Sequence, residues 1–576
     1  MRKKHLLLLG VALLSTLTTR ADHFQSGDLY YDFTSDTTVE VVEPSYWDST
    51  DYQGLTIVTI PATVTYYTTT YSVTSIGRGA FDGCDSLTSV TIGNSVTNIG
   101  ERAFGACVSL TSVTIGNSVT SIGREAFYAC YSLTSVTIPN SVTSIGYSAF
   151  GLCSSLTSVT IGNSVTSIGK EAFWNCFALT SIVVESGNTM YDSRNNCNAI
   201  IETATNTLVF GCQSTIIPES VTSIGEKAFY WCTSLTSVTI GNSVTNIGEE
   251  AFCGCLFTSV TIPNSVTSIG GWAFYDCSAL TKLICSGHVE NIGQGVLFGC
   301  HALDTVAISA QAFDVSEGNW LYLPKNIRYI KVAGGELTDD AFNVILRSYK
   351  TLGTLDLAAA TNTTLSDKAF YECYNLQTLT LPSQLQVVPY KAVADCQLLQ
   401  SVTIPATVEE IGNSAFENCR SLSEVTFEDG IALERIGGWA FYNCHDLQSI
   451  TIPEGVTEIG DAAFYGCNYL QDLSLPGSLR KIGDNTFALC SKLQKMQVDA
   501  AVPPAVESKT FLDVLRTIPV IVPDEAVADY KAAEVWKEFN IIGESNAPMA
   551  VGNTRDDNAQ GVRKVVHDGQ VVMSYT

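Results

Sequence analysis

The sequence predicts a solenoid: a stack of short coils, mainly β-strand with short helical turns, built from 23-residue repeats in two arrays. The copies in the first array start at Ser72, Ser95, Ser118, Ser141, Ser164, Ser220, Ser243 and Ser265, and a diverged copy covers 288–300. The second array has its equivalent apolar residues at Leu385, Val408, Leu433, Val456 and Leu479, with spacings of 23, 25, 23 and 23. A fixed period over so many copies is typical of stacked repeats.

Each copy has three parts. The stretch "LTSVTI", from Leu110 to Ile115, is rich in β-branched residues and predicts a strand. Two-residue alternation turns Leu110, Val113 and Ile115 inward and leaves Ser112 and Thr114 outward. "SVTSIG" predicts a second short strand that closes on a glycine with a positive φ. "EAFYAC" predicts a helical turn that carries Phe and Cys into the core.

A single coil buries too few apolar side chains to fold alone, so the array needs caps at both ends. The stretch 183–219 interrupts the first array and predicts a β-hairpin that bulges from one face, and 301–362, with a helix in "TDDAFNVILRSYKTL", predicts a bend within one continuous solenoid. The chain is therefore expected to divide into a signal peptide (1–21), an N-terminal β cap (22–71), array 1 (72–300, with the hairpin insertion at 183–219), an irregular connecting segment (301–362), array 2 (363–499), a C-terminal cap (500–543) and a polar tail (544–576).

The first residues predict export. Arg2, Lys3 and Lys4 precede an apolar run from Leu6 to Leu17, which is too short to span a bilayer, and cleavage is expected after Ala21. No later apolar run is long enough for a transmembrane helix. Asp and Glu outnumber Lys and Arg by 57 to 31, for a net charge of -26. This charge argues against nucleic acid and against docking on anionic lipid, because both need clustered basic residues.

The phrase "IPNSVTSIGYSAFGLCSSLTSVTI" resembles the BspA-like class of leucine-rich repeat, which occurs mostly in surface proteins of host-associated bacteria and some protists. The resemblance covers roughly residues 27 to 540 and defines the repeat class without defining a ligand. It implies a β-rich N-terminal cap and a C-terminal cap whose helix lies in "AVADYKAAEVW". It also implies adhesion as the role, and the tail is shorter than a complete sorting domain of such surface proteins.

Nineteen cysteines raise the question of disulfides. Fifteen share one repeat position, where a ladder of buried free thiols is expected and a disulfide ladder is the alternative for an exported protein. Their odd number does not allow full pairing, and stacked equivalents point the same way. Cys197 and Cys212 lie in the insertion, where a hairpin would bring them together, so a disulfide between them is possible.

The sequence predicts no enzyme, and no catalytic, cofactor-binding or metal-binding residues. It contains no catalytic motif in a supporting context, and the repeat cysteines lack His or Cys partners at metal-ligand spacing. Acidic pairs such as Glu409–Glu410 are expected on any acidic exported surface.

The outward strand positions form the candidate binding face. Stacking aligns hydroxyl side chains along one sheet of array 1, and the equivalent positions of array 2 carry charges, which specific recognition needs. The candidate residues are Ser89, Thr91, Ser112, Thr114, Ser135, Thr137, Ser158, Thr160, Glu424, Thr426, Asp472 and Ser474.

Together these observations predict a non-catalytic binding protein, exported to the medium or displayed on the cell surface. Its expected partner is an extracellular protein, either host matrix or another cell's surface, held by the solenoid face. A glycan-binding or envelope scaffold protein is the alternative, and ice binding through the Ser/Thr rows is a further one.

Overall fold

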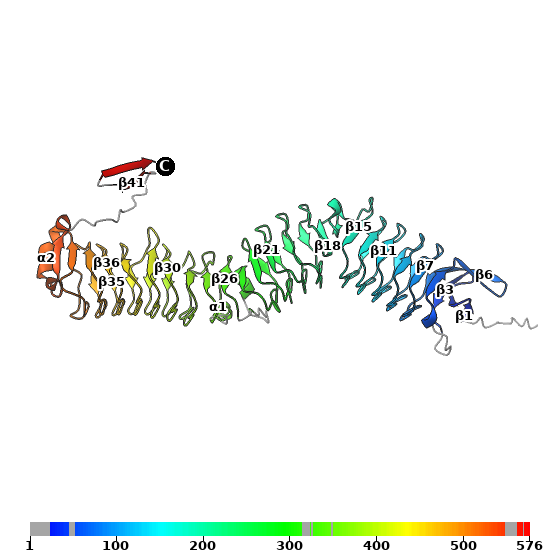
Figure 1. Ribbon diagram of the computed structural model, residues 1–576, viewed down its shortest axis with the longest axis horizontal. Helices are drawn as coiled ribbons and strands as arrows, with labels where there is room; N and C mark the ends of the chain where they lie inside the picture. The colour runs from blue at the N-terminus through cyan, green and yellow to red at the C-terminus, as the bar shows by residue number, and fades with distance from the viewer. Residues whose placement is uncertain are drawn as a thin grey trace, which may run out of the picture.

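The chain forms a long stack of β-rich coils, as the computed structural model shows (Figure 1). The structure describes residues 23–44, 52–313, 323, 326–346, 350–547, 562–567 and 570–575, so the expected signal peptide lies outside it. The predicted leucine-rich-repeat solenoid is confirmed. Its axis turns near β15 (Ser181–Val184) and β18 (Thr207–Gly211), within the predicted insertion, and again near β26 (Tyr329–Val332). The sequence placed a bend only at the second of these points.

The N-terminal end is closed by antiparallel strands. β1 (His23–Ser26), β2 (Leu29–Phe33) and β3 (Thr38–Val42) pair in order, and β5 (Thr63–Tyr66) pairs with β6 (Thr69–Ile76). β3 then pairs with β6 in parallel, which joins these strands to the first coil. A 3-10 turn, η1 (Tyr52–Gly54), precedes β4 (Ile57–Ile60), which already pairs in parallel with the next coil. The stack therefore begins inside the segment expected to be a cap.

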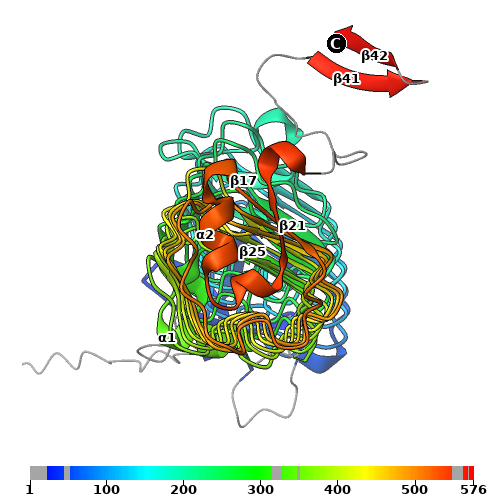
Figure 2. The ribbon, with the colours of Figure 1, turned by 90° about the vertical axis from the view of Figure 1, so that its left-hand side faces the viewer.

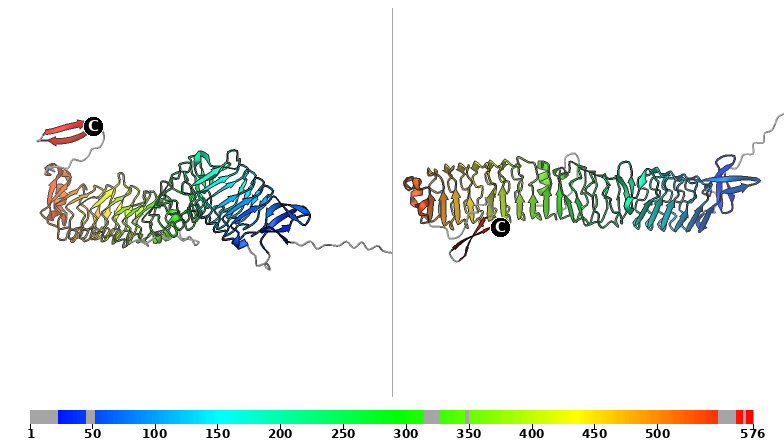
Figure 3. Two further views of the ribbon diagram at one scale, coloured as in Figure 1. Left: turned by 45° about the vertical axis from the view of Figure 1, so that its right-hand side comes forward. Right: turned by 90° about the horizontal axis from the view of Figure 1, so that it is seen from above.

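Most coils contribute one longer strand to a row of parallel sheets, whose strands lie side by side along the molecule (Figure 3). The first sheet contains β4, β7 (Ser89–Ile92) and β9 (Ser112–Thr114), and the second contains β11 (Ser135–Ile138), β13 (Ser158–Ile161) and β15. The third contains β21 (Ser259–Ile262), β23 (Lys282–Cys285), β25 (Thr305–Ile308), β26, β27 (Thr354–Asp356), β28 (Thr378–Thr380), β30 (Ser401–Ile404) and β32 (Glu424–Phe427). The fourth contains β34 (Ser449–Thr451), β36 (Asp472–Leu475), β38 (Lys495–Val498), β39 (Pro519–Val522) and β40 (Asn540–Gly543). The third sheet runs through 301–362 without a break.

After the first copy, which lies in β6, the "SVTSIG" phrases form two-residue strands on a second side of the coil. These short strands are β8 (Asn98–Ile99), β10 (Ser121–Ile122), β12 (Ser144–Ile145) and β14 (Ser167–Ile168); then β19 (Ser223–Ile224), β20 (Asn246–Ile247), β22 (Ser268–Ile269) and β24 (Asn291–Ile292); and then β29 (Val387–Val388), β31 (Glu410–Ile411), β33 (Arg435–Ile436), β35 (Glu458–Ile459) and β37 (Lys481–Ile482).

The glycine that closes each short strand does not take the positive φ that the sequence led us to expect. Gly100, Gly123 and Gly146 lie instead against the backbone of the preceding coil. A Cβ atom added to Gly123 would lie 2.7 Å from the carbonyl carbon of Gly100. Glycine is needed here because the stacked backbones approach so closely.

The third part of each coil, which we call the turn segment, is a run of tight turns and not a regular helix. Two residues in each take a positive φ, for example Arg102 (52°) and Ala106 (53°). Left-handed residues at this spacing prevent an α-helix from propagating. Phe104 and Cys107 are nevertheless fully buried, as expected.

The core is made of aligned identical side chains. The rings of Phe81, Phe104, Phe127, Phe150 and Phe173 stack with centroids 5.1, 5.2, 5.2 and 5.5 Å apart. The repeat cysteines lie beside them, and most of their thiols bond to a carbonyl oxygen one coil back, as with Cys130 Sγ and Phe104 O at 3.2 Å. Equivalent residues thus pack on each other along the axis, which explains the sameness of the copies.

The insertion adds an antiparallel hairpin to the stack. β16 (Tyr191–Asp192), η2 (Arg194–Asn196), β17 (Ala199–Glu202) and β18 form it, and β18 pairs in parallel with the short strand β19. The hairpin therefore lies within the row of short strands, and part of the insertion projects beyond the outline of the other coils (Figure 2).

Two helices complete the structure. α1 (Asp339–Leu346) begins beside Thr338, which accepts a hydrogen bond from Ala341 N at 3.2 Å, and η3 (Ala310–Phe313) lies near it. At the C-terminal end α2 (Val527–Ala532) lies across the last coils (Figure 2), flanked by η5 (Asp524–Ala526), η6 (Trp536–Glu538) and η7 (Glu544–Asn546). The described part of the tail forms an antiparallel hairpin, β41 (Val562–His567) and β42 (Gln570–Tyr575).

Candidate binding face

The outward residues of the long strands line up as the spacing predicts. Ser89 pairs with Ser112 and Thr91 with Thr114 in one sheet, and Ser135 with Ser158 and Thr137 with Thr160 in the next. Glu424 and Thr426 on β32 pair with Ser401 and Thr403, and Asp472 and Ser474 on β36 pair with Ser449 and Thr451. The strand pairing is interrupted between β9 and β11 and between β32 and β34. All twelve candidate side chains are exposed or half-buried.

The side chains of the face change along the stack. From β7 to β13 the rows are Ser and Thr, and the Ser112 hydroxyl donates to the Ser89 hydroxyl at 3.1 Å. Farther along, Lys282, Tyr329, Glu424, Asp472 and Lys495 occupy the equivalent of the Ser89 position. Asp472 Oδ1 lies 3.2 Å from Lys495 Nζ on the next strand. The second half of the face thus offers charges in a fixed order.

Other threonine rows serve the stack itself. Before several long strands, a threonine hydroxyl donates to a backbone carbonyl one coil back, as from Thr111 to Thr88 O at 2.9 Å and from Thr157 to Thr134 O at 2.9 Å. Before each short strand the same bond recurs, as from Thr120 to Thr97 O at 3.0 Å. These hydroxyls are occupied, whereas those of Thr91, Thr114, Thr137 and Thr160 make no such bond to any backbone group in the described part of the chain.

One coil of array 2 is two residues longer than the others, and it shapes a hollow on the face. The hollow has a volume of about 510 Å³ and includes Glu424, Thr426, Glu428, Asp429 and Glu454 among its lining residues. Gly430 takes φ 72° in the extra loop, which lets the chain turn beside β32. Glu424 and Thr426, selected by sequence position, therefore lie in an acidic groove.

Cys197 and Cys212, between which the hairpin made a disulfide possible, are both free thiols in the structure. Cys197 Sγ lies 3.8 Å from Ala199 O, whereas Cys212 Sγ bonds to Asn198 O at 3.3 Å. Cys197 packs in the hydrophobic core that follows the insertion and Cys212 in the core that precedes it. The hairpin thus directs the two side chains to different cores.

The repeat cysteines are free thiols as well. Burial raises the pKa of Cys130, Cys153 and Cys444 well above the usual value for a thiol, and it raises the pKa of Cys490 to about 12. A thiol is reactive as its thiolate, so these groups are chemically quiet in the folded chain.

A cavity that sequence reasoning missed lies between the turn segments on either side of the insertion. It has a volume of about 270 Å³, and Trp174, Tyr191, Phe210 and Tyr230 are among its lining residues. We call it the junction cleft. Its only sequence signal was the interruption of the period at 183–219.

Two ion pairs span the junction cleft. Lys170 Nζ lies 2.9 Å from Glu226 Oε1, and Lys227 Nζ lies 2.7 Å from Glu171 Oε1. Burial alone would raise the pKa of Glu171, but hydrogen bonds from Lys227 and from the Tyr147 hydroxyl outweigh it and lower that pKa. Glu171 therefore stays ionised and held in place.

Within the described residues, no three His, Cys, Asp or Glu side chains are grouped so that they would hold a metal ion. In the same ranges, no helix has the length and apolar content needed to cross a membrane.

Comparison with known proteins places the repeat in a family. The model of the BspA type leucine-rich-repeat region matches residues 53–200, 209–331, 348–436 and 431–514. Among curated proteins, none matches the chain.

Solved structures of similar chains include three leucine-rich-repeat proteins. A leucine-rich repeat protein from Bacteroides ovatus is 26% identical, with 82% of this chain and 94% of that chain covered and a TM-score of 0.36. A leucine-rich cell surface protein from Faecalibacterium prausnitzii is 24% identical, with coverages of 83% and 95% and a TM-score of 0.27. A leucine-rich repeat protein from Eubacterium ventriosum is 22% identical, with coverages of 77% and 93% and a TM-score of 0.36.

The matched ranges extend over both arrays and over the irregular segment between them, so they account for more than half of the residues. On that match, this chain belongs to the BspA type leucine-rich-repeat family.

Proposed function

We propose that this chain is an exported, non-catalytic binding protein that holds an extracellular protein, such as a matrix or cell-surface protein, on its long-strand face. One observation carries the proposal. The outward positions of successive long strands form exposed rows, which are Ser and Thr from β7 to β13 and include the charged side chains Glu424 and Asp472 on β32 and β36. Such rows supply an extended surface whose charge differs from place to place, and protein recognition needs such local differences.

The proposed specific contact lies around β32 and β36. Glu424 and Thr426 line the acidic groove, and Asp472 stands on the neighbouring sheet. Because charged side chains at the edge of an interface mainly steer association, the partner is expected to offer basic residues here. Recognition should then weaken as salt concentration rises.

The test is binding of the purified chain to a panel of immobilised matrix proteins. Charge reversal at both carboxylates, Glu424→Lys with Asp472→Lys, is expected to lower the affinity for the partner about tenfold or more. The matched control is Glu409→Lys with Glu434→Lys, which makes the same charge change beside the short strands and should keep the wild-type affinity. Equal binding by all three chains would remove these positions from the site, and no binding to any matrix protein would contradict adhesion to matrix.

The alternative of glycan binding requires exposed aromatic rings beside the hydroxyl rows. Among the described residues the face itself carries the half-buried Tyr329 on β26, whereas the exposed rings lie elsewhere, as with Tyr147, Tyr390 and Trp439 in turn segments. The long-strand face therefore favours a protein partner over a sugar.

A further inference from the structure

The hydrogen-bond ladder between turn segments is interrupted at the insertion. In the regular array, three backbone amides of one turn segment donate to three carbonyls of the next. Before the insertion these bonds run from Phe150 N to Ala172 O at 2.8 Å and from Leu152 N to Trp174 O at 2.7 Å, and after it from Phe229 N to Ala251 O at 2.8 Å. Between these two stretches the direct bonds are missing, because the hairpin separates the coils.

The interruption leaves backbone donors on one wall of the junction cleft. By the repeat pattern, the amides of Glu171, Phe173 and Asn175 should donate to the next coil. None of the three has an acceptor within the described residues. A free amide in a partly enclosed site favours a ligand that offers carbonyl oxygens.

The facing wall carries the matching acceptors. In the pattern, the carbonyls of Glu226, Ala228 and Tyr230 should each receive an amide. Only Ala228 O receives one, from Gly211 N at 2.9 Å, and Glu226 O and Tyr230 O have no donor in the described part of the chain. The hairpin thus fills one of three places in the ladder, and the cleft has donors on one side and acceptors on the other.

The side chains around the cleft favour an apolar, uncharged occupant. Phe210 lies 5.5 Å from Phe173, centroid to centroid, and stays half-buried where it lines the cleft. The Trp174 indole nitrogen is buried without a hydrogen-bond partner among the described residues. The two spanning ion pairs cancel in charge, so the lining offers a charged ligand no opposite net charge.

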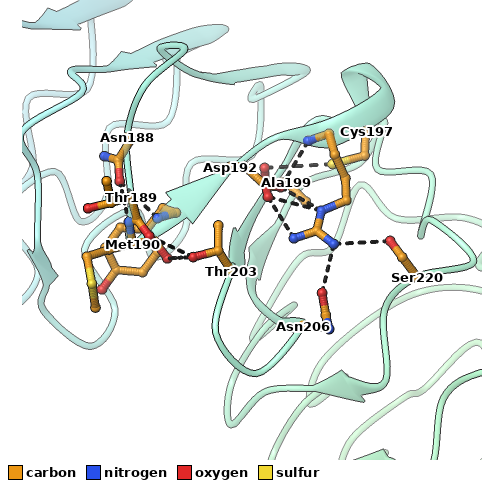
Figure 4. A network of polar contacts seen from close by, with 11 residues as sticks. Asn188, Thr189, Met190, Asp192, Cys197, Ala199, Thr203, Asn206 and Ser220 are labelled. Carbon is orange, nitrogen blue, oxygen red and sulfur yellow. Dashed lines mark hydrogen bonds and ion pairs between the residues drawn. The ribbon is translucent and has the colours of Figure 1, made fainter.

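The hairpin that opens the cleft is held rigidly. The Arg194 guanidinium donates to Asp192, to Asn206 at 2.8 Å and to Ser220 at 3.3 Å, and the dashed bonds to these three residues are visible in Figure 4. Asn188 Nδ2 donates to Gly162 O at 3.1 Å and to Val165 O at 3.0 Å, which fixes the start of the insertion on the preceding coil. A rigid frame keeps the cleft formed before any ligand binds, which lowers the cost of binding.

We propose that the junction cleft binds an extended peptide segment that carries one apolar or aromatic side chain. The peptide backbone would complete the part of the ladder that lines the cleft, by accepting from Glu171 and Phe173 and by donating to Glu226 and Tyr230. Its side chain would lie against Trp174 and Phe210. Main-chain pairing with a pocket for a side chain is a general way in which proteins bind peptides.

Saturation-transfer NMR on the full chain tests the proposal with the capped tripeptide acetyl-Ala-Leu-Ala-amide. We expect binding that weakens about fivefold or more when the leucine nitrogen is methylated, because that removes one backbone donor. Replacing the leucine by Asp or Lys should abolish binding. Absence of binding by the leucine peptide, or equal binding by its N-methyl analogue, would overturn the proposal, as would binding of methyl β-glucoside in its place.

Variants locate the site. Val209→Phe adds a ring to the cleft wall and should weaken peptide binding about fivefold or more, whereas Val183→Phe adds the same ring to the exposed face of β15 and should not. Trp174→Leu provides a second test if Val209→Phe lowers the melting temperature. Unchanged binding by both cleft variants would overturn the proposal. The reversal Glu424→Lys with Asp472→Lys should leave peptide binding intact, so the cleft and the long-strand face can fail separately.

Discussion

At the scale of single residues, the repeated cysteine is a packing group whose chemistry the fold suppresses. Cys490 is fully buried, and its Sγ lies 3.4 Å from Phe464 O. Burial raises its pKa to about 12, against an ordinary thiol value of 9.0. A folded pKa above the unfolded one means that the unfolded chain releases the proton first. The stabilising contribution is complete below pH 9 and is lost progressively as pH rises toward 12.

This linkage predicts a pH effect that a single substitution isolates. Between pH 8 and pH 10.5, wild type should lose about 2 kcal/mol more unfolding free energy than Cys490→Ala, because the thiol ionises only in the unfolded chain. Urea unfolding at both pH values measures the difference. Tyrosines and lysines titrate in both chains and cancel in the comparison. An equal loss of unfolding free energy in wild type and in Cys490→Ala would show that Cys490 ionises equally when folded and unfolded.

From the sequence, the burial of side chains was predicted more accurately than the backbone angles. Phe104 and Cys107 are core residues because period and apolarity determine burial. The positive φ values fall on Arg102 and Ala106 and not on Gly100, because a local motif does not reveal how closely the next coil approaches. The possible disulfide in the insertion failed for a similar reason: spacing along a hairpin does not say to which core each side chain turns.

At the scale of elements, the insertion determines where the regular stacking of the coils is interrupted. The sequence predicted a hairpin at 183–219, and the structure has strands β17 and β18 there. It did not predict that β18 would pair with the short strand β19 and separate two turn segments, since that pairing depends on three-dimensional register. The junction cleft follows from this placement, so it was not accessible from the repeat pattern.

Gly211 determines how the hairpin meets the following coil. A Cβ atom on Gly211 would lie 2.2 Å from Phe229 Cε1, whereas one on Gly54 would meet nothing within 4 Å. We expect Gly211→Ala to lower the unfolding free energy by about 1–3 kcal/mol through overpacking, and Gly54→Ala to have little effect. Adding Phe229→Leu to Gly211→Ala should restore part of the loss. Thermal unfolding followed by circular dichroism measures all of these, and equal midpoints for the two alanine variants would contradict the contact.

At the scale of the whole molecule, each coil is stabilised by the coils stacked on either side of it. Each coil buries its apolar side chains against two neighbours, so an open end exposes a ready surface for another chain. The C-terminal cap covers that surface with two fully buried aromatic side chains. The Tyr530 hydroxyl donates to Ala500 O at 2.8 Å, and Trp536 Nε1 donates to Pro504 O at 2.9 Å.

The cap's role predicts the behaviour of two shortened chains. A chain that ends at Asp499 keeps array 2 but loses the cap, so Phe487 loses the ring of Phe511 that stacks on it at 5.6 Å. The exposed end should pair with other copies, because its strand edge and apolar side chains have no cover. A chain that ends at Ala547 keeps the cap and should sediment like the full-length protein. Sedimentation velocity at equal concentrations distinguishes them: faster, broader boundaries for the shorter chain alone support the cap's role, and identical boundaries would show that the last coil needs no cover.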